Sequence, residues 1–425
     1  MMLLYEPLLG CVQKVSKSRN IPAKAINSFG RIYQDRLCRG RTKEKLVSTA
    51  LKSVCMIADF VEPPYVDGVV NTVKGWADGV AGAGWRVTVF SSTTGRVREY
   101  CDTTSVVYQY SLSRQKRFQL TPSYYMKFGN QVARRVSGED FDILHLHSLK
   151  GLSSVPFLLR IQRKFKKPKV VSCYSDRDLG VFGLRNQCFS AFTVPTRGLK
   201  DRLVRRGVRS DRIHIIPPCL DLQRFRSYDK SHARKMLGLP ETGRYLGFAG
   251  HLKVGRGILD LLRAHASLKQ KFPDLRLVLA SSGYGDSMLI SELKKILVCR
   301  DDIQELGQLT DPALFYNAVD AYVLPTRSSK FVLPIPLTII EAMACGTPVV
   351  CSDASSSPVI KDRENGFVFE SRNVQSLVDC IGMLLREPWL TDECVGRAGR
   401  VVKENYSKSI IVNRIVEMYE NELRR

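Results

Sequence analysis

The residues best placed to do chemistry in this chain are Glu341 and the short segments on either side of it. An apolar run at 320–325, typical of a buried strand, comes first and is followed by a short loop. A helix is then predicted with Glu341 in its first turns, before the Gly-Thr-Pro segment 346–348. A helix N-terminus offers free N–H groups and a positive dipole end to an anion such as a diphosphate. A carboxylate one turn further along can accept hydrogen bonds from two ribose hydroxyls, although Glu before Ala-Met-Ala is also an ordinary helix beginning.

The composition is typical of a soluble globular protein. The chain has 425 residues, enough for two or three domains of about 150 residues each. Hydrophobic residues make up 44% and charged residues 25%, and no apolar run approaches the roughly 18 residues that span a bilayer. The first ten residues carry the acidic Glu6 and no basic leader, which is a poor secretory signal. The twelve Cys include no C-x-x-C pair, which predicts neither zinc nor a disulfide framework and favours a reducing, cytoplasmic setting.

The net charge of +24 is unusual, and it is unevenly distributed. Nearly all of the excess of Lys and Arg over Asp and Glu lies in residues 1–225, whereas residues 226–425 are close to neutral. An anionic partner is therefore expected for the first half of the chain. Residues 1–50 are basic and lack a long apolar strand, so they are predicted to form an extension, partly helical or disordered, before the folded core.

Strand-like runs alternate with helical patterns from residue 51 onward, which indicates β-α-β units on parallel sheets. The prediction is of two doubly wound Rossmann-like domains, 51–225 and 226–404, that face each other across a cleft. A linker follows Pro217-Pro218, and a C-terminal helix at 405–425 could return to the first domain. Ligands of such sheets bind at the carboxyl ends of the strands. The predicted strands are 54–59, 86–90, 142–147, 169–172, 191–194, 212–216, 245–250, 275–280, 321–324, 348–351 and 366–369.

The segment 341–350 closely resembles the nucleotide-binding signature of the retaining glycosyltransferases of family 4 (glycosyl transferases group 1), which have the GT-B fold. The resemblance covers roughly residues 52–420, and 211–225 is similar to the family's linker phrase. It implies transfer of a hexose-type sugar from a UDP- or GDP-linked donor with retention of configuration. It also implies that no metal and no cofactor are needed, that the first domain binds the acceptor and that the second domain binds the nucleotide-sugar.

The resemblance places the donor site at the beginning of the predicted helix, with Pro336, Leu337, Thr338 and Glu341. Thr338 could donate to a phosphate or cap the helix. The segment 250–257 resembles the family's basic phosphate clamp, whose usual Arg and Lys are replaced here by a His and an Arg.

Those two clamp positions are His251 and Arg256. Arg256 keeps the charge and gains a planar fork suited to phosphate, although it could also be a solvated loop cation. His251 keeps a hydrogen-bond donor but is not reliably charged at neutral pH. The clamp is therefore expected to be weaker than usual.

Two features of the first domain also resemble the family. Gly68 lies between a strand and a helix pattern, where its backbone could approach the donor, although it could also only shape a turn. The His in the family at the position of His147 lies beside the donor sugar, and His145 shares its face of the strand. Both His could instead be structural. The catalytic candidates are therefore His147, Arg256 and Glu341.

The clearest departure from the family lies eight residues before Glu341, where Leu333 replaces a Glu that normally binds hydroxyls of the transferred sugar. The Gly-Phe-Gly that usually follows is Pro334-Ile335-Pro336 here. Nucleotide recognition is therefore supported better than sugar recognition. Either the donor differs, or Arg327 or Lys330 binds the sugar instead, or activity has been lost.

A basic cluster in the first half suits an anionic membrane surface, because its cations are interleaved with Ile and Phe. The leading hypothesis is a peripheral cytoplasmic enzyme that acts on a glycan or lipid-linked acceptor at a membrane, and the alternative for this cluster is a solvated helix face. The cluster comprises Arg160, Arg163, Lys164, Lys166, Lys167 and Lys169.

The second candidate function is a non-catalytic GT-B scaffold or partner subunit, motivated by Leu333 and His251, and a sugar-nucleotide epimerase is a weaker candidate. Nucleic acid is not expected as a partner, since no zinc-finger or RNP signature is present. The oligomeric state stays open.

Overall fold

The predicted alternation of strands and helices builds two separate sheets. A computed structural model describes residues 51–58, 68–92, 99–102, 106–111, 122–138, 140–147, 155–175, 178, 188–356 and 358–425. Leu51–Arg425 forms one compact unit. The predicted basic extension, residues 1–50, lies outside the described residues.

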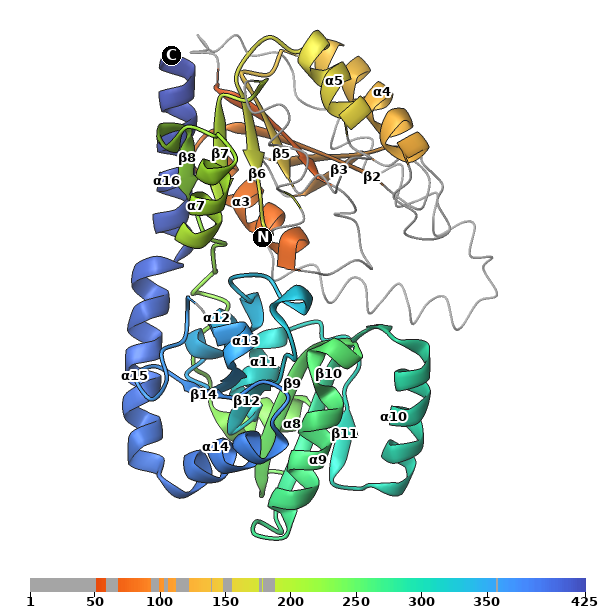
Figure 1. The fold of residues 1–425 in the computed structure, drawn as a ribbon, viewed down its shortest axis with the longest axis vertical. Coiled ribbons are helices and arrows are strands. Elements are labelled where there is room, and N and C mark those ends of the chain that lie inside the picture. The colour runs from red at the N-terminus through yellow and green to blue at the C-terminus, as the bar shows by residue number, and fades with distance from the viewer. Residues whose placement is uncertain are drawn as a thin grey trace, which may run out of the picture. The chain divides into compact units, whose positions relative to one another are not determined.

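The first sheet has eight strands in the order β3-β4-β2-β1-β5-β6-β7-β8 (Figure 1). Its central strand β1 pairs in parallel with β2 and β5, and β3 pairs antiparallel with β4 at one edge. Every residue of β1 is buried, as its continuous apolar sequence predicts for a strand covered on both faces. The strands are β1 (Ser53–Ala58), β2 (Arg86–Ser92), β3 (Glu99–Asp102), β4 (Val106–Ser111), β5 (Ile143–His147), β6 (Lys169–Ser172), β7 (Ala191–Val194) and β8 (Ile213–Ile215).

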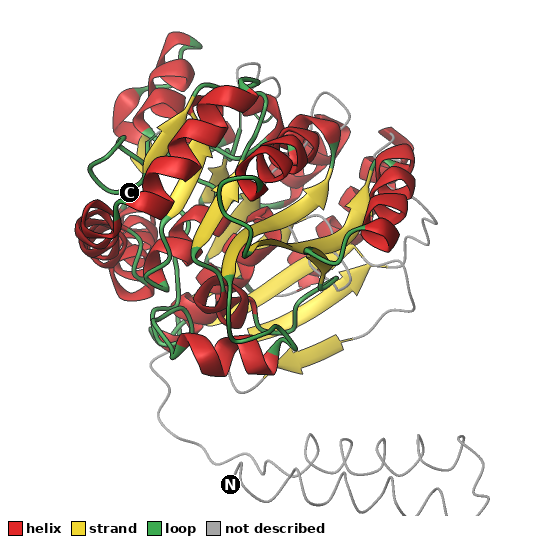
Figure 2. Ribbon diagram, turned by 90° about the horizontal axis from the view of Figure 1, so that it is seen from below, coloured by secondary structure: helices red, strands yellow, loops and turns green. Residues whose placement is uncertain are grey.

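Helices cover both faces of this sheet, and Figure 2 shows helices packed around the strands of the molecule. Alternate residues of β1 enter different cores: Cys55 and Ile57 pack with α4 and α5, whereas Val54 and Met56 pack with α3 and α16. The chain thus follows the period of two that a doubly covered strand requires. The helices are α3 (Gly68–Gly82), α4 (Pro122–Gly138), α5 (Val155–Lys164), α7 (Arg197–Arg205) and α16 (Lys408–Arg424).

The second sheet has six strands, all paired in parallel, in the order β11-β10-β9-β12-β13-β14. Strand order reverses between β9 and β12, so the helix after β9 and the helix after β12 lie on opposite faces. Such a switch point is where ligands of doubly wound sheets bind. The strands are β9 (Arg244–Leu252), β10 (Leu275–Gly285), β11 (Ile303–Glu305), β12 (Ala321–Leu324), β13 (Val349–Ser352) and β14 (Phe367–Phe369).

Two groups of helices sandwich the second sheet. One core joins α8, α11, α12 and α15 to the sheet, and the other joins α9, α10 and α14 to it. No helix in the described ranges is both long and apolar enough to cross a bilayer. The helices are α8 (Lys230–Met236), α9 (Ile258–Lys269), α10 (Ser287–Cys299), α11 (Pro312–Ala318), α12 (Leu337–Ala344), α13 (Asp353–Ser356), α14 (Val374–Arg386) and α15 (Pro388–Asn405).

The C-terminal helix α16 belongs to the core of the first sheet. Met418 and Tyr419 are buried in the same cluster as β1 and α3. Gly79 of α3 leaves room for Val412, because a side chain at Gly79 would overlap it. The chain leaves this sheet after β8 and returns to it at α16, and backbone hydrogen bonds at Leu220 join these two segments. The Leu220 N–H donates to the Tyr406 carbonyl at 2.7 Å, and the Leu220 carbonyl accepts from the Lys408 N–H at 3.0 Å.

Candidate functional site

Three of the predicted donor-site residues form the N-terminus of α12. Pro336 is the N-cap and makes no side-chain capping hydrogen bond, Leu337 is the first helical residue, and Thr338 is the second. The capping role considered for Thr338 is therefore wrong. Because proline has no side-chain acceptor, no capping side chain competes with an anion for the first N–H groups of this helix.

Glu341 lies one turn further along α12 and is only 8% exposed. Its Oε2 atom accepts a hydrogen bond of 2.7 Å from the Tyr316 hydroxyl. Burial raises the pKa of Glu341 to about 6, although the Tyr316 hydroxyl and the Arg224 guanidinium both act to lower it. A carboxylate at this depth is costly to keep charged, which is typical of a group kept for function rather than for stability.

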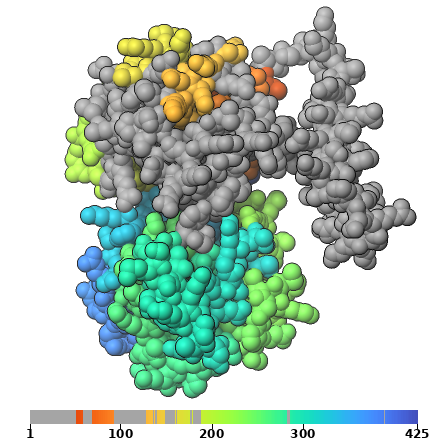
Figure 3. All heavy atoms as spheres, turned by 90° about the vertical axis from the view of Figure 1, so that its right-hand side faces the viewer, coloured from red at the N-terminus to blue at the C-terminus, as the bar shows by residue number. Residues whose placement is uncertain are grey.

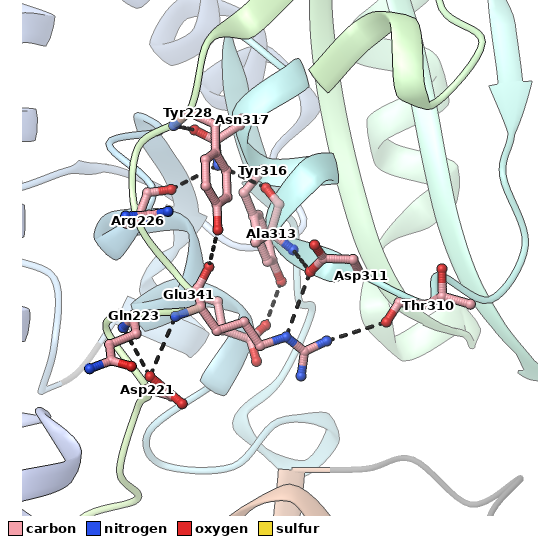
Figure 4. A network of polar contacts seen from close by, with 11 residues as sticks. Asp221, Gln223, Arg226, Tyr228, Thr310, Asp311, Ala313, Tyr316, Asn317 and Glu341 are labelled. Atoms are coloured by element: carbon pink, nitrogen blue, oxygen red, sulfur yellow. Dashed lines mark hydrogen bonds and ion pairs between the residues drawn. The ribbon is translucent and has the colours of Figure 1, made fainter. Parts of the chain in front are cut away.

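A network of polar contacts surrounds Glu341 and includes the linker that precedes α8 (Figure 4). The Arg224 guanidinium lies 3.6 Å from Asp311 Oδ1 and donates to the Thr310 carbonyl at 3.3 Å. Asn317 accepts from the Tyr228 N–H at 2.7 Å and donates to the Arg226 carbonyl at 2.9 Å.

These contacts fasten the linker to α11. The backbone that carries Arg224 is held at both ends, since Asp221 Oδ1 accepts from the Gln223 N–H and the Tyr228 hydroxyl donates to the Arg224 carbonyl. The position of the Arg224 cation near Glu341 is therefore set by local structure rather than by a ligand.

The loop after β9 brings Arg256 to the same end of the sheet. A side chain added at Gly250 would place its Cβ 4.0 Å from Arg256 Nη1. Burial lowers the pKa of Arg256, but the ordinary value is high enough for the guanidinium to stay charged. Burial raises the pKa of the Tyr322 hydroxyl, and interactions with Thr338 and Arg256 both act to lower it. His251 is the penultimate residue of β9 and is half-buried.

The alternative sugar-binding cations occupy the loop after β12. Arg327 Nε lies 3.4 Å from Oδ2 of the buried Asp260 on α9, and the Arg327 N–H donates to the Gly255 carbonyl at 2.9 Å. Arg327 is thus tied to the loop that carries Arg256. Lys330 lies in a short 3-10 helix and is exposed.

The side chain of Leu333 lies so close to Gly68 that it explains why residue 68 has no side chain. Gly68 is the first residue of α3, and a Cβ added there would lie 2.7 Å from Leu333 Cδ1. Gly68 therefore leaves space for Leu333, at the position where the resemblance led us to expect a Glu. An apolar methyl group, rather than a carboxylate, lies against the beginning of α3.

The two His of β5 are buried in a polar chain that starts at the C-terminal helix. His145 Nδ1 bonds the Tyr419 hydroxyl at 2.5 Å and its Nε2 bonds the Ser172 hydroxyl at 2.7 Å. The rings of His145 and His147 are 4.1 Å apart, and His147 Nδ1 bonds the Tyr174 hydroxyl at 2.8 Å. His145 thus has a complete structural role.

His147 differs because its Nε2 has no hydrogen-bond partner among the described residues. Burial lowers the pKa of His147 to about 3, so the ring is neutral at physiological pH. His147 ends β5 beside Ala58, the last residue of β1, at the carboxyl edge where α3 begins. An unsatisfied buried nitrogen at this edge is what a ligand-binding His would present.

The predicted basic cluster is only partly a surface feature. Arg163, Lys164 and Lys166 are exposed at and after the end of α5, which is yellow in Figure 3. Lys167 is exposed, but its Nζ atom forms an ion pair with Asp140 Oδ1 at 2.6 Å. Lys169 is buried and its Nζ donates to the carbonyls of Phe165 and Lys167 at 3.1 Å.

Lys169 therefore closes the turn after α5 and is not part of a surface patch. Including it in the patch was wrong, because it is buried: its position in β6 turns it inward. The side chain of Arg160 lies outside the described residues. The surface patch is hereafter Arg163, Lys164 and Lys166.

Sequence reasoning missed Tyr316 and Arg224. Neither belongs to a motif, and the hydroxyl of Tyr316 meets Glu341 only through the packing of α11 against α12. The one available signal was Asp311-Pro312, a helix beginning that places Tyr316 in the first turns of a helix next to the Glu341 helix.

The fold and the site define a glycosyltransferase of GT-B type. Residues 66–224 match the family model described as Glycosyltransferase Family 4, and residues 243–387 match the model described as Glycosyl transferases group 1. The chain belongs to this family of group 1, family 4 glycosyltransferases. The prediction of the family and of two Rossmann-like sheets is thereby confirmed.

Solved structures and a curated relative agree with this assignment. Sucrose-phosphate synthase from Thermosynechococcus elongatus is 20% identical, with a TM-score of 0.71 over 87% of this chain and 98% of that chain. HepE from Anabaena, solved with UDP and glucose, is 17% identical, with a TM-score of 0.67 over 87% of this chain and 100% of that one. These two similarities show the fold.

In sequence, D-inositol 3-phosphate glycosyltransferase from Mycobacterium bovis is 31% identical over 205 residues, which is 46% of this chain and 39% of that protein. The match therefore spans less than half the length of the curated relative.

Proposed function

We propose that this protein transfers a hexose-type sugar from a UDP- or GDP-linked donor to a glycan or lipid-linked acceptor, with retention of configuration and without a metal. The bond between the anomeric carbon and the diphosphate breaks, a bond to the acceptor oxygen forms, and the acceptor proton is lost. The observation that carries the proposal is the buried Glu341 carboxylate one turn inside an uncapped helix N-terminus. HepE, which shares the fold, was solved with UDP-glucose.

Each candidate residue has a role in this proposal. The N–H groups of α12 and the Arg256 guanidinium stabilise the charge that develops on the leaving diphosphate, which is often the largest catalytic contribution. Glu341 accepts hydrogen bonds from the ribose hydroxyls. The neutral His147 offers its open Nε2 to the donor sugar, and Gly68 and His251 line the approach to it.

Calorimetric titration of the protein with UDP, GDP and their common sugar conjugates tests the proposal. We expect saturable binding of one nucleotide, which would also identify the base. Binding of none of them would contradict the proposal.

The alternative is a non-catalytic GT-B scaffold, and the Leu333 methyl group against Gly68 is the observation that favours it. The enzyme would turn over the nucleotide-sugar donor, whereas the scaffold would not. Release of free UDP or GDP from the donor, measured with and without candidate acceptors, supports the enzyme, whereas tight binding without release supports the scaffold.

We further propose that the enzyme acts at the cytoplasmic face of a membrane through Arg163, Lys164 and Lys166. Each cation near an anionic surface contributes about 1 kcal/mol. Reversal of all three charges to Glu is therefore expected to weaken binding to anionic vesicles by at least about a hundredfold, measured by co-sedimentation at low salt.

The matched control reverses the same number of charges elsewhere. Lys235, Lys271 and Lys403 are exposed on helices or loops of the second sheet. If their reversal weakens sedimentation as much as reversal of the patch, net charge rather than the patch governs binding, and the membrane proposal is wrong.

A further inference from the structure

The Glu341 carboxylate needs a partner that holds it in one orientation. Its side chain has several rotatable bonds, and freezing them has an entropic cost unless a contact already present in the free protein does so. The Tyr316 hydroxyl is that contact, at 2.7 Å from Oε2.

Tyr316 is itself fixed without help from a ligand. The residue is 1% exposed, and its ring meets Tyr322 edge-on at 5.4 Å and Phe225 at 6.5 Å. The Thr347 hydroxyl donates to the Tyr316 carbonyl at 2.7 Å, which anchors its backbone to the segment after α12. The hydroxyl is thus aimed at Glu341 by packing.

We propose that Tyr316 is a positioning residue of the nucleotide site, whose hydroxyl holds Glu341 Oε2 so that Oε1 faces a ribose hydroxyl of the donor. This inference rests on the proposed function. Tyr316 acts through Glu341, so its removal leaves the phosphate contacts of Arg256 and α12 in place.

Several ionisable groups face Glu341 from the elements around it. Tyr316 belongs to α11, Arg224 to the linker and Tyr322 to β12, and Cys345 is the C-cap of α12. Burial and the Glu341 charge raise the pKa of Tyr316 well above its ordinary value, so its hydroxyl keeps its proton and remains a donor. Loss of that donor removes one of the two groups that hold the pKa of Glu341 down.

The experiment compares Tyr316→Phe with Tyr245→Phe. Tyr245 is a suitable control because it is equally buried and its hydroxyl donates to the Pro240 carbonyl at 2.9 Å, away from the site. The titration of Glu341 is followed by carbon NMR of labelled Glu in the absence of nucleotide, with Glu341→Gln to assign the signal.

We expect Tyr316→Phe to move the Glu341 midpoint upward by about one pH unit, the size of one hydrogen bond to a charged group, and Tyr245→Phe to leave it unchanged. UDP or GDP, whichever binds, should then be bound more weakly by Tyr316→Phe, with a larger deficit at pH 6 than at pH 8. An unchanged midpoint in folded Tyr316→Phe would overturn the inference.

A second variant, and the titration measured without nucleotide, allow the role of Tyr316 to be tested separately from folding and from the proposed function. Arg224 is half-exposed, so Arg224→Gln tests the same electrostatics with little risk to folding and should also raise the midpoint. If wild type binds no nucleotide, the proposed function fails, whereas the Glu341 titration still reports whether Tyr316 holds the carboxylate.

Discussion

Replacing Glu341 with glutamine is expected to remove most nucleotide binding and, at neutral pH, to make the folded protein more stable. Glutamine keeps the shape of the side chain and an oxygen that can accept from Tyr316. It loses the charge that strengthens hydrogen bonds from ribose hydroxyls, so we expect affinity for UDP or GDP to fall at least about tenfold, or about 1.4 kcal/mol.

The stability gain follows from the raised pKa of this carboxyl. In the unfolded chain Glu341 titrates near 4.5, whereas in the folded protein it titrates near 6 because of burial. Between these values the folded state binds more protons, so stability falls as pH rises through this window. Above about pH 6 the buried charge of Glu341 lowers the free energy of unfolding by its full amount, roughly 2 kcal/mol. Below about pH 4.5 this loss of stability is absent.

Urea unfolding at pH 4 and pH 7, together with nucleotide titration at pH 7, measures both effects. The advantage of Glu341→Gln should appear at pH 7 and vanish at pH 4. Glu404→Gln, which changes an exposed carboxylate on α15, is the control and should alter neither quantity. A variant that binds nucleotide like wild type would show that Glu341 is structural.

Much of the fold could be predicted because apolar runs and chain-breaking residues repeat regularly. The predicted strands at 169–172, 191–194 and 321–324 coincide with β6, β7 and β12. The edge strand β3, its neighbour β4 and the three-residue edge strand β11 were missed, because short strands at or next to the edge of a sheet need not be continuously apolar.

The site was harder to predict than the fold. Motifs made Glu341 and Arg256 candidates for the site, because backbone geometry at a helix N-terminus or a glycine loop leaves a local signature. Tyr316 and Arg224 meet Glu341 through tertiary packing, which no local pattern records. Lys169 shows the reverse error, since a cation in a basic run was counted as exposed although its strand turns it inward.

The largest effect on stability is expected from Gly257→Ala. Gly257 joins the Arg256 turn to α9 with φ of 76°, a left-handed conformation that costs other residues about 1–2 kcal/mol. A Cβ there would also overlap the Pro325 carbonyl, whose carbon would lie 2.7 Å away. The obstacle is backbone at the end of β12, so it cannot move aside as a flexible side chain would. We expect a loss of at least about 3 kcal/mol in the free energy of unfolding.

Gly346→Ala separates the two causes. Gly346 has the same φ of 76°, but the nearest atoms to an added Cβ are 3.9 Å away, which is ordinary contact. This variant should therefore lose only the backbone preference, about 1–2 kcal/mol. Equal losses in the two variants, measured by urea unfolding at one pH, would show that the β12 loop yields freely. A much larger loss for Gly257→Ala would establish that the loop holding Arg256 is pressed against β12 and kept in place by the absence of a side chain.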